Sequence, residues 1–163
     1  MEQNALYVLA GFDPETEQKL ANLQELLYEQ GFTGLQTKNI PMHITMGAFP
    51  VTQETELVQK LVSLAQSTAA FPVNFQHIGI FTGAKVLFAA PDAGEPMLQL
   101  RKQFGDCDGW TPHTTLLMDD PTVIYKALPV VLQHFSAMQG KITCLHLYEF
   151  FPPRHIATVQ LKG

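Results

Sequence analysis

The sequence contains few cysteines and few basic residues, and both shortages exclude classes of protein. Cys107 and Cys144 are its only cysteines. They form neither a Cys-x-x-Cys pair nor the dense pattern of a disulfide scaffold, so we expect two free thiols in a reducing compartment. Ten Lys and Arg stand against 15 Asp and Glu, which gives a net charge of −5. Because cationic contacts to phosphates supply most of the affinity for a long nucleic acid, we expect no such partner. A small ligand with one or two phosphates remains compatible with this charge.

Long apolar runs are missing as well. No stretch approaches the roughly 18 apolar residues of a membrane span. The N-terminal segment carries Glu2 in place of basic residues, and its apolar run over 5–10 is shorter than that of an export signal. We therefore expect a cytoplasmic protein with no membrane partner. With 163 residues, 46% of them hydrophobic and 15% charged, the chain is expected to fold as one domain over 1–163.

Two short motifs stand out against this background. The first reads His-Ile-Thr-Met at residues 43–46, and the second reads His-Thr-Thr-Leu at 113–116. Each follows a proline closely and opens an apolar run of the length of a strand. Residues i and i+2 of a strand face the same side. The motifs therefore predict that His43 projects with Thr45, and His113 with Thr115, each pair from one face of its strand.

The segments around the motifs repeat in the same order, strand, helix, motif strand, helix, strand. In the first half we predict a strand at 5–10, a helix from Asp13-Pro14 to Gly31, a strand at 42–49, a helix at 52–68 and a strand at 71–81. In the second half we predict a strand at 85–90, a short helix after Pro96, the motif strand from His113, a helix from Asp120-Pro121 to about 138 that kinks or breaks near Pro129, and a strand at 141–150. A last strand is predicted at 154–161. His77 and His146 fall at matching places when Phe81 is aligned with Phe150.

This order predicts an α+β fold built from two repeat units, roughly 5–81 and 85–151. Two such units normally pack about a pseudo-twofold axis. We expect two pseudo-symmetric lobes, each an antiparallel-rich sheet with helices on its outer side, around a central groove. The two motifs would then face each other across that groove, although 70 positions separate them in the sequence.

Two facing His-Thr pairs suit displacement at a phosphorus atom. The pKa of histidine lies near physiological pH, so a neutral imidazole accepts a proton from the attacking group while an imidazolium protonates the leaving oxygen. Each threonine hydroxyl donates to a non-bridging phosphate oxygen. This chemistry needs no metal, and neither histidine has a second His or acid at ligand spacing. We expect no metal and no cofactor.

With these motifs the sequence resembles the 2H phosphoesterase superfamily, which includes 2′-5′ RNA ligase-like proteins and cyclic nucleotide phosphodiesterases. The resemblance implies two lobes around a groove and hydrolysis or ligation at 2′,3′-cyclic or 2′-5′ phosphodiesters. It assigns catalysis to His43 and His113, and phosphate binding to Thr45 and Thr115. Many members place a cation after the second motif, whereas this sequence continues Leu-Met-Asp-Asp at 117–120. We therefore favour small cyclic phosphates or nucleotide-like esters as substrates.

Further candidates have an ordinary structural explanation of equal or greater weight. Lys85 and Arg154 border strands and are candidates for anchoring a phosphate or ribose at the rim, whereas Arg101 is expected on a helix surface. Trp110 and Tyr148 are candidates for stacking a base, although core packing accounts for both equally well. For His77 and His146, a half-exposed strand position is favoured over a place in the groove. His134 and His155 are expected on the surface.

The leading interpretation is a phosphodiesterase for a small phosphodiester, a nucleotide or an RNA 3′-end, acting as a monomer. A second is a non-catalytic module that binds a phosphorylated small ligand or an RNA end in the same groove. A third is a scaffold in which the His-x-Thr pairs are incidental.

Overall fold

The computed structural model describes residues 4–83 and 85–163. Its strands are β1 (Ala5–Phe12), β2 (His43–Pro50), β3 (Phe71–Phe81), β4 (Val86–Pro91), β5 (Thr114–Met118), β6 (Met138–Phe150) and β7 (Arg154–Gln160). Its helices are α1 (Pro14–Glu29), α2 (Glu54–Ser67), α3 (Glu95–Lys102) and α4 (Pro121–His134), with the short 3₁₀ turn η1 (Val51–Gln53) before α2. The predicted order of strands and helices is confirmed, and so is the α+β class.

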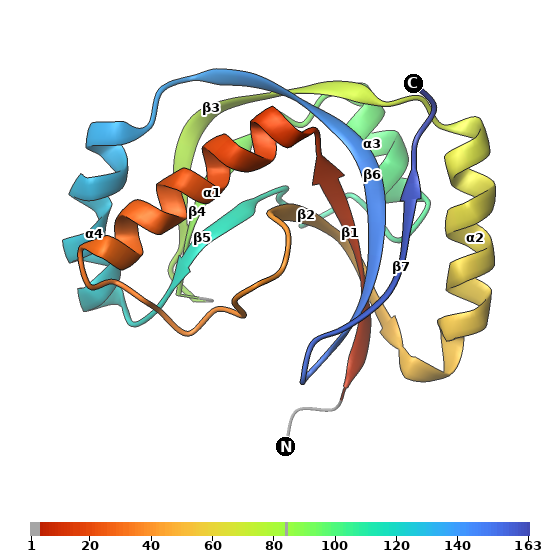
Figure 1. The fold of residues 1–163 in the computed structure, drawn as a ribbon, viewed down its shortest axis with the longest axis horizontal. Helices are drawn as coiled ribbons and strands as arrows, with labels where there is room; N and C mark the ends of the chain where they lie inside the picture. The colour runs from red at the N-terminus through yellow and green to blue at the C-terminus, as the bar shows by residue number, and fades with distance from the viewer. Residues whose placement is uncertain (1–3, 84) are drawn as a thin grey trace.

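All seven strands belong to one antiparallel sheet, in the order β2-β1-β6-β3-β4-β5, with β7 added to β6. Two separate sheets were expected, and the pairing of β3 with β6 joins them. Both β3 and β6 are long enough to pair with different strands along different parts of their length. Residues 71–75 of β3 pair with 138–142 of β6, while the rest of β3 pairs with β4 and the rest of β6 with β1. Figure 1 shows both strands arching across the molecule. The division into two lobes stays a prediction.

The strand registers support the proposed repeat. On β1, Leu9 pairs with His146 of β6. On β4, Ala90 pairs with His77 of β3. His77 and His146 are the positions that the alignment of Phe81 with Phe150 makes equivalent. The third strand of each unit therefore pairs with the first strand of the other unit, because β6 lies beside β1 and β3 beside β4.

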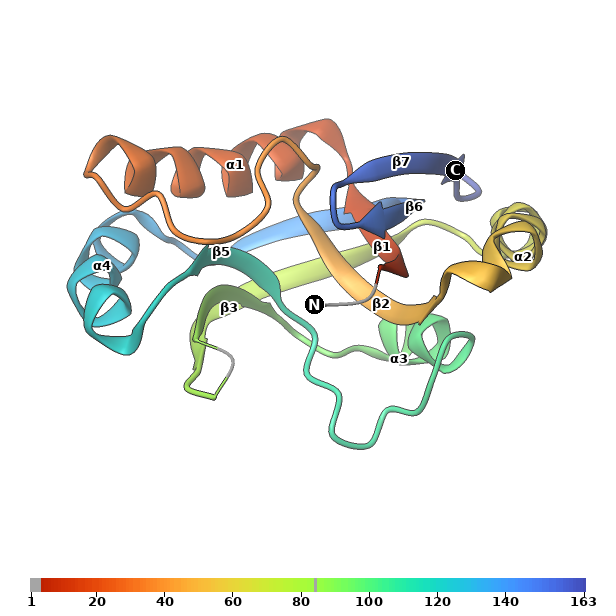
Figure 2. The same cartoon turned by 90° about the horizontal axis from the view of Figure 1, so that it is seen from below.

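The sheet curves strongly, and this curvature positions the site. β2 and β5 lie at opposite ends of the strand path, so hydrogen bonds within the sheet do not join them. They nevertheless contact each other, and Figure 2 shows them side by side at the centre of the molecule. A twisted sheet closes toward a barrel in this way. Both motif strands are thereby brought to one place.

The helices begin where the sequence signals indicate. Asp13 caps α1 by accepting a hydrogen bond from the backbone N–H of Thr16, and Pro14 occupies the first turn. Leu20, Leu23 and Leu27 of α1 are buried, so this helix packs its leucine face into the core. In Figure 1, α1 and α4 lie together at one side of the molecule and α2 lies at the other. None of the helices described here is long and apolar enough to cross a membrane.

Around α4, the predicted end of the helix is wrong, and the helix does not break at Pro129. The helix is continuous through Pro129, which is exposed, and no break occurs there. It ends at His134, and β6 begins at Met138, where the sequence analysis still expected helix. Gly140 lies within β6. A Cβ atom at this position would approach the Thr16 hydroxyl oxygen to 2.4 Å, so glycine is needed here for close packing against α1.

Candidate active site

The two motifs occupy matching environments on β2 and β5. Ile44 and Met46 are fully buried, as are Thr114 and Leu116. His43, Thr45, His113 and Thr115 are partly exposed on the opposite faces. This alternation is the one expected for i and i+2 positions. β5 begins at Thr114, one residue later than predicted, so His113 lies immediately before the strand.

Both imidazoles are oriented by the same hydrogen bond. Nδ1 of His43 lies 2.7 Å from the carbonyl oxygen of Pro41, and Nδ1 of His113 lies 2.9 Å from that of Thr111. A carbonyl oxygen only accepts, so Nδ1–H is the donor in each ring. Nε2 is therefore the nitrogen that can exchange a proton with a ligand. The tautomer of both histidines is set by the backbone two residues upstream.

Burial shifts both imidazoles toward the neutral form. Desolvation lowers the pKa of His43 below its usual 6.5, opposed by the hydrogen bond to Pro41, and the charge of His113 lowers this pKa further. Desolvation also lowers the pKa of His113, opposed by the hydrogen bond to Thr111. Because a proton on one ring disfavours a proton on the other, the pair favours one neutral and one charged imidazole over two charged ones.

Aromatic rings flank the second motif. The ring of His113 meets Phe81 edge to face at 4.8 Å and Phe88 at 5.5 Å. In the first half, Tyr7 and Phe150 form an aromatic pair with centroids 5.3 Å apart. These contacts fix the His113 ring while its Nδ1 is held by the backbone. They leave rotation about χ1 and χ2 little room.

A bulge in each motif strand sets the direction of the histidine and threonine. Met46 on β2 has no partner on β1, because Val8 pairs with 47 and Leu9 with 45. Leu116 on β5 is skipped in the same way. Bulges re-aim side chains and are common beside active sites. Here each bulge falls directly after the threonine of its motif.

The carbonyl oxygens at these bulges accept bonds from side chains. Arg101 of α3 donates through Nη1 to Met46 O at 2.6 Å. Gln24 of α1 donates to Leu116 O at 3.0 Å. Arg101 lies on α3 and is partly exposed, as expected, and its guanidinium also bonds the backbone of β2. Sequence reasoning missed both hydrogen bonds, because helical spacing alone identifies no partner 55 or 92 positions away.

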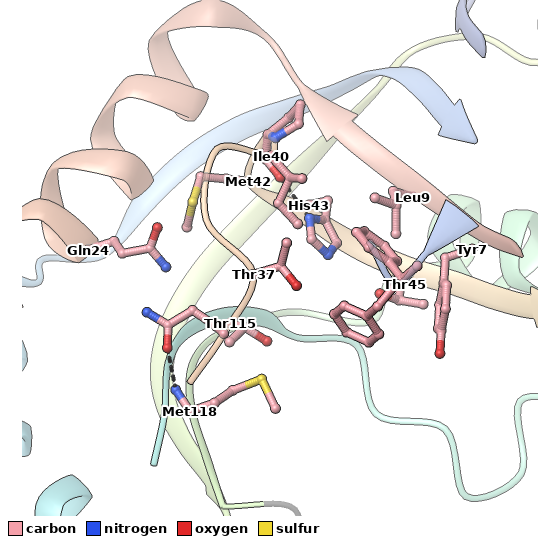
Figure 3. A pocket seen from close by; sticks show the side chains of 14 residues that line it. Tyr7, Leu9, Gln24, Thr37, Ile40, Met42, His43, Thr45, Thr115 and Met118 are labelled. Atoms are coloured by element: carbon pink, nitrogen blue, oxygen red, sulfur yellow. Dashed lines mark hydrogen bonds between the residues drawn. The ribbon is translucent and has the colours of Figure 1, made fainter. Parts of the chain in front are cut away.

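A cavity of about 200 Å³ adjoins the motifs. Figure 3 shows its side chains arranged around a common space. They are supplied by α1, β1, β2, β5, β6 with the residue after it, and the segment 30–42 that follows α1. Its lining residues are Tyr7, Leu9, Gln24, Gln36, Thr37, Ile40, Pro41, Met42, His43, Thr45, Thr115, Met118, Phe150 and Phe151. Three of the four motif side chains thus line the cavity, and His113 lies outside the lining.

The segment 30–42 is fastened to the end of β5. The backbone N–H of Leu35 donates to Met118 O at 2.7 Å, and the buried Gln36 side chain accepts from the N–H of Met118 at 3.0 Å. Gly34 permits the turn before it, with φ of +67°, and leaves no room for a Cβ because Gln36 Oε1 would lie 2.1 Å away. The segment therefore forms a fixed wall that joins the surroundings of both motifs.

The other sequence candidates lie mostly elsewhere. Lys85 pairs with Asp120 at 3.0 Å, and Arg154 pairs with Glu54 and Glu149 at 2.8 Å each. These carboxylates raise the pKa of Arg154. Neither cation lines the cavity. The structure thus gives each of them an ion-pair partner away from the motifs.

Trp110 and Tyr148 are both close to the site without lining the cavity. The indole N–H of Trp110 donates to Thr45 O at 3.3 Å, and Arg101 lies over its ring at 5.3 Å. Tyr148 stacks on Phe150 with centroids 5.7 Å apart and planes 7° apart. The Trp110 side chain therefore bonds the backbone of the first motif at Thr45. Tyr148 stacks on Phe150, which lines the cavity.

His77 and His146 occupy equivalent strand positions in different surroundings. His77 is exposed, 3.8 Å from Asp92. His146 is partly buried, and its Nδ1 lies 2.8 Å from the hydroxyl of Thr158. Burial, then the charges of His155 and His43, lower the pKa of His146 to about 4. His146 is thus a neutral third imidazole near His43.

The described residues contain no group of three or more His, Cys, Asp or Glu side chains that could hold a metal ion. The chemistry that the site can perform by itself is proton transfer and hydrogen bonding. Two imidazoles present Nε2, and two threonines present hydroxyl groups. Acid–base catalysis with anion stabilisation requires these groups.

Comparison with known proteins agrees with this arrangement. Escherichia coli LigT without ligand superposes with a TM-score of 0.64 at 13% identity, over 99% of this chain and 100% of LigT. LigT in complex with 3′-AMP gives 0.65 at 14%, over 99% and 100%. A Thermus thermophilus protein, TT0787, gives 0.65 at 16%, over 98% of both chains. At these identities the matches establish the fold. No curated protein matches the chain significantly in sequence.

A family model extends the agreement from fold to sequence. The model of the 2′-5′ RNA ligase superfamily matches residues 12–150, which include both motifs. The resemblance to 2H phosphoesterases is thereby confirmed. The chain is a member of the 2′-5′ RNA ligase superfamily.

Proposed function

We propose that the protein is a metal-independent phosphodiesterase that hydrolyses 2′,3′-cyclic or related small nucleotide-like phosphodiesters. His43 and His113 act as general base and general acid, and Thr45 and Thr115 bind the phosphate. The observation that carries the proposal is the matched pair of hydrogen bonds from Nδ1 to a backbone carbonyl. A repeated bond of this kind leaves Nε2 of both rings for proton transfer.

The reaction follows from the protonation states of the two rings. The neutral imidazole takes a proton from water through Nε2 as the water oxygen forms a bond to phosphorus. The charged imidazole gives its Nε2 proton to the departing ribose oxygen as that P–O bond breaks. After the turnover the two rings have exchanged states, and proton exchange with solvent resets them. Ligation would use the same two groups, with a ribose hydroxyl in place of water as the nucleophile that attacks phosphorus.

Stabilisation of the phosphate falls to the threonines. Charge builds on the non-bridging oxygens as the fifth bond to phosphorus forms, and each hydroxyl donates one hydrogen bond to them. The bulges at Met46 and Leu116 and the bonds from Arg101 and Gln24 hold the threonine backbones in place. Preorganised donors of this kind stabilise a transition state without reorganising during the reaction.

The test is hydrolysis of adenosine 2′,3′-cyclic monophosphate in the presence of EDTA. Wild type should form one nucleoside monophosphate isomer, and His43→Ala and His113→Ala should each lower kcat/KM by about 10²–10⁴-fold. His134→Ala is the matched control, because His134 is exposed and bonds only the Val130 carbonyl of its own helix. Full activity of either motif variant contradicts the proposal, and tight binding without turnover supports the non-catalytic alternative.

A further inference from the structure

The cavity beside the first motif has a wall without positive charge. None of its lining side chains, among the residues that the structure describes, is Lys or Arg. Most of the wall is apolar or aromatic, with Tyr7, Met42, Met118 and Phe150 as its larger members. Gln24, Gln36 and Thr37 supply neutral polar groups.

Four of the basic residues are engaged in interactions outside the cavity lining. Lys38 donates to Thr33 O within the segment 30–42 and lies over the ring of Tyr28. Arg101 bonds the Met46 carbonyl behind β2. Lys85 and Arg154 are paired with carboxylates. A ligand in the cavity therefore meets neutral groups, apart from His43.

A wall of this composition favours uncharged ligand groups over charged ones. A phosphate that enters a confined apolar site loses its hydration, and that loss is compensated only by charged or multiple hydrogen-bonding partners. Arg and Lys normally supply them. An uncharged organic group loses little hydration and gains apolar and aromatic contact. Its volume of about 200 Å³ lies below the range of about 300–1,000 Å³ that ligand pockets usually span.

We infer that this cavity binds the uncharged organic part of the phosphodiester, such as a nucleoside with an unmodified 5′-hydroxyl, and discriminates against a ligand that places a second phosphate there. The inference rests on the proposed function, because His43, Thr45 and Thr115 at the cavity edge mark where the reacting phosphate lies. It narrows the substrate class to esters with a single phosphate. Dinucleotides and oligonucleotide ends that continue through a 5′-phosphate are disfavoured.

Met118 offers a direct way to alter this selectivity. Its side chain lines the cavity and is 37% exposed, so a longer side chain has a route to solvent. Its backbone carries the bonds to Leu35 and Gln36, which a side-chain substitution leaves in place. Met118→Arg therefore adds a cation to the cavity wall, and Met118→Leu keeps the wall neutral as the matched control.

The experiment compares the Kd of adenosine 3′-monophosphate with that of adenosine 3′,5′-bisphosphate by isothermal titration calorimetry. Wild type and Met118→Leu should bind the monophosphate at least tenfold more tightly, and Met118→Arg should reduce or reverse this ratio. Equal or tighter binding of the bisphosphate by wild type overturns the inference, as does failure of both ligands to bind. Selective binding of the monophosphate without hydrolysis of the cyclic ester contradicts the proposed function and leaves the inference standing.

Discussion

His146 gives the molecule a stability that depends on pH. Its ring lies where a side chain at position 11 would be, because a Cβ on Gly11 would approach its Nε2 to 2.6 Å. Nδ1 bonds the hydroxyl of Thr158, which also lies 2.7 Å from Nε2 of exposed His155. Nε2 lies 3.5 Å from the thiol of Cys144. None of these partners compensates a positive charge on the ring.

The size of the effect follows from the pKa. The pKa of His146 falls from 6.5 to about 4, and each unit corresponds to about 1.4 kcal/mol. We reduce the resulting contribution of His146 to the free energy of unfolding to about 2 kcal/mol, because the ring is only partly buried and solvent screens its charge. Between pH 4 and 6.5 the unfolded chain binds more protons at this residue than the folded protein. The free energy of unfolding therefore falls as the pH decreases through this window.

The assay is urea unfolding at pH 7.5 and pH 4.5, followed by circular dichroism. The free energy of unfolding of wild type should fall by about 2 kcal/mol more than that of His146→Gln. His134→Gln is the control and should behave like wild type, because His134 is exposed and bonds its own helix. Groups that do not interact with His146 titrate alike in wild type and His146→Gln, so they cancel in the comparison. An equal loss of stability in wild type and His146→Gln refutes the reasoning.

Three further predictions concern the motif strands. Burial lowers the pKa of both His43 and His113 below 6.5, so the bell-shaped profile of kcat/KM against pH should have its maximum on the acidic side of 6.5, and a maximum above pH 7 contradicts this. The Thr114 hydroxyl is buried without a hydrogen-bond partner among the described residues, so Thr114→Val should raise the free energy of unfolding by about 1 kcal/mol in a urea titration, and a loss of stability contradicts this. Arg101→Leu leaves the Met46 carbonyl without its side-chain donor and should lower stability by about 1–3 kcal/mol and kcat/KM with it, whereas the exposed Lys102→Ala should change neither.

The sequence predicts the elements well because their signals are local. Asp13 and Pro14 mark the start of α1, and Asp120 and Pro121 mark the start of α4. The alternation of buried and exposed residues in the motifs follows from strand geometry alone. Aligning Phe81 with Phe150 also places His77 and His146 at matching positions, and the two histidines occupy equivalent places in the registers of β3 and β6.

The features that tertiary contacts create are not predictable in this way. The bonds from Arg101 and Gln24 to the bulge carbonyls join distant segments, and no periodicity indicates them. The continuous sheet depends on the ends of β3 and β6 reaching each other. Lys85 and Arg154 are attractive phosphate anchors in the sequence, yet carboxylates brought near by folding pair with them. Local sequence determines what a residue can do, and the fold determines which partner it meets.

The central claim is that the side chains of two distant motifs converge on one phosphate. A crystal structure of the protein with inorganic phosphate tests it most directly. We expect a single phosphate within hydrogen-bond distance of Nε2 of His43 and His113 and of the hydroxyls of Thr45 and Thr115. A phosphate held by one motif alone, with the other imidazole directed to a separate surface, would contradict the account.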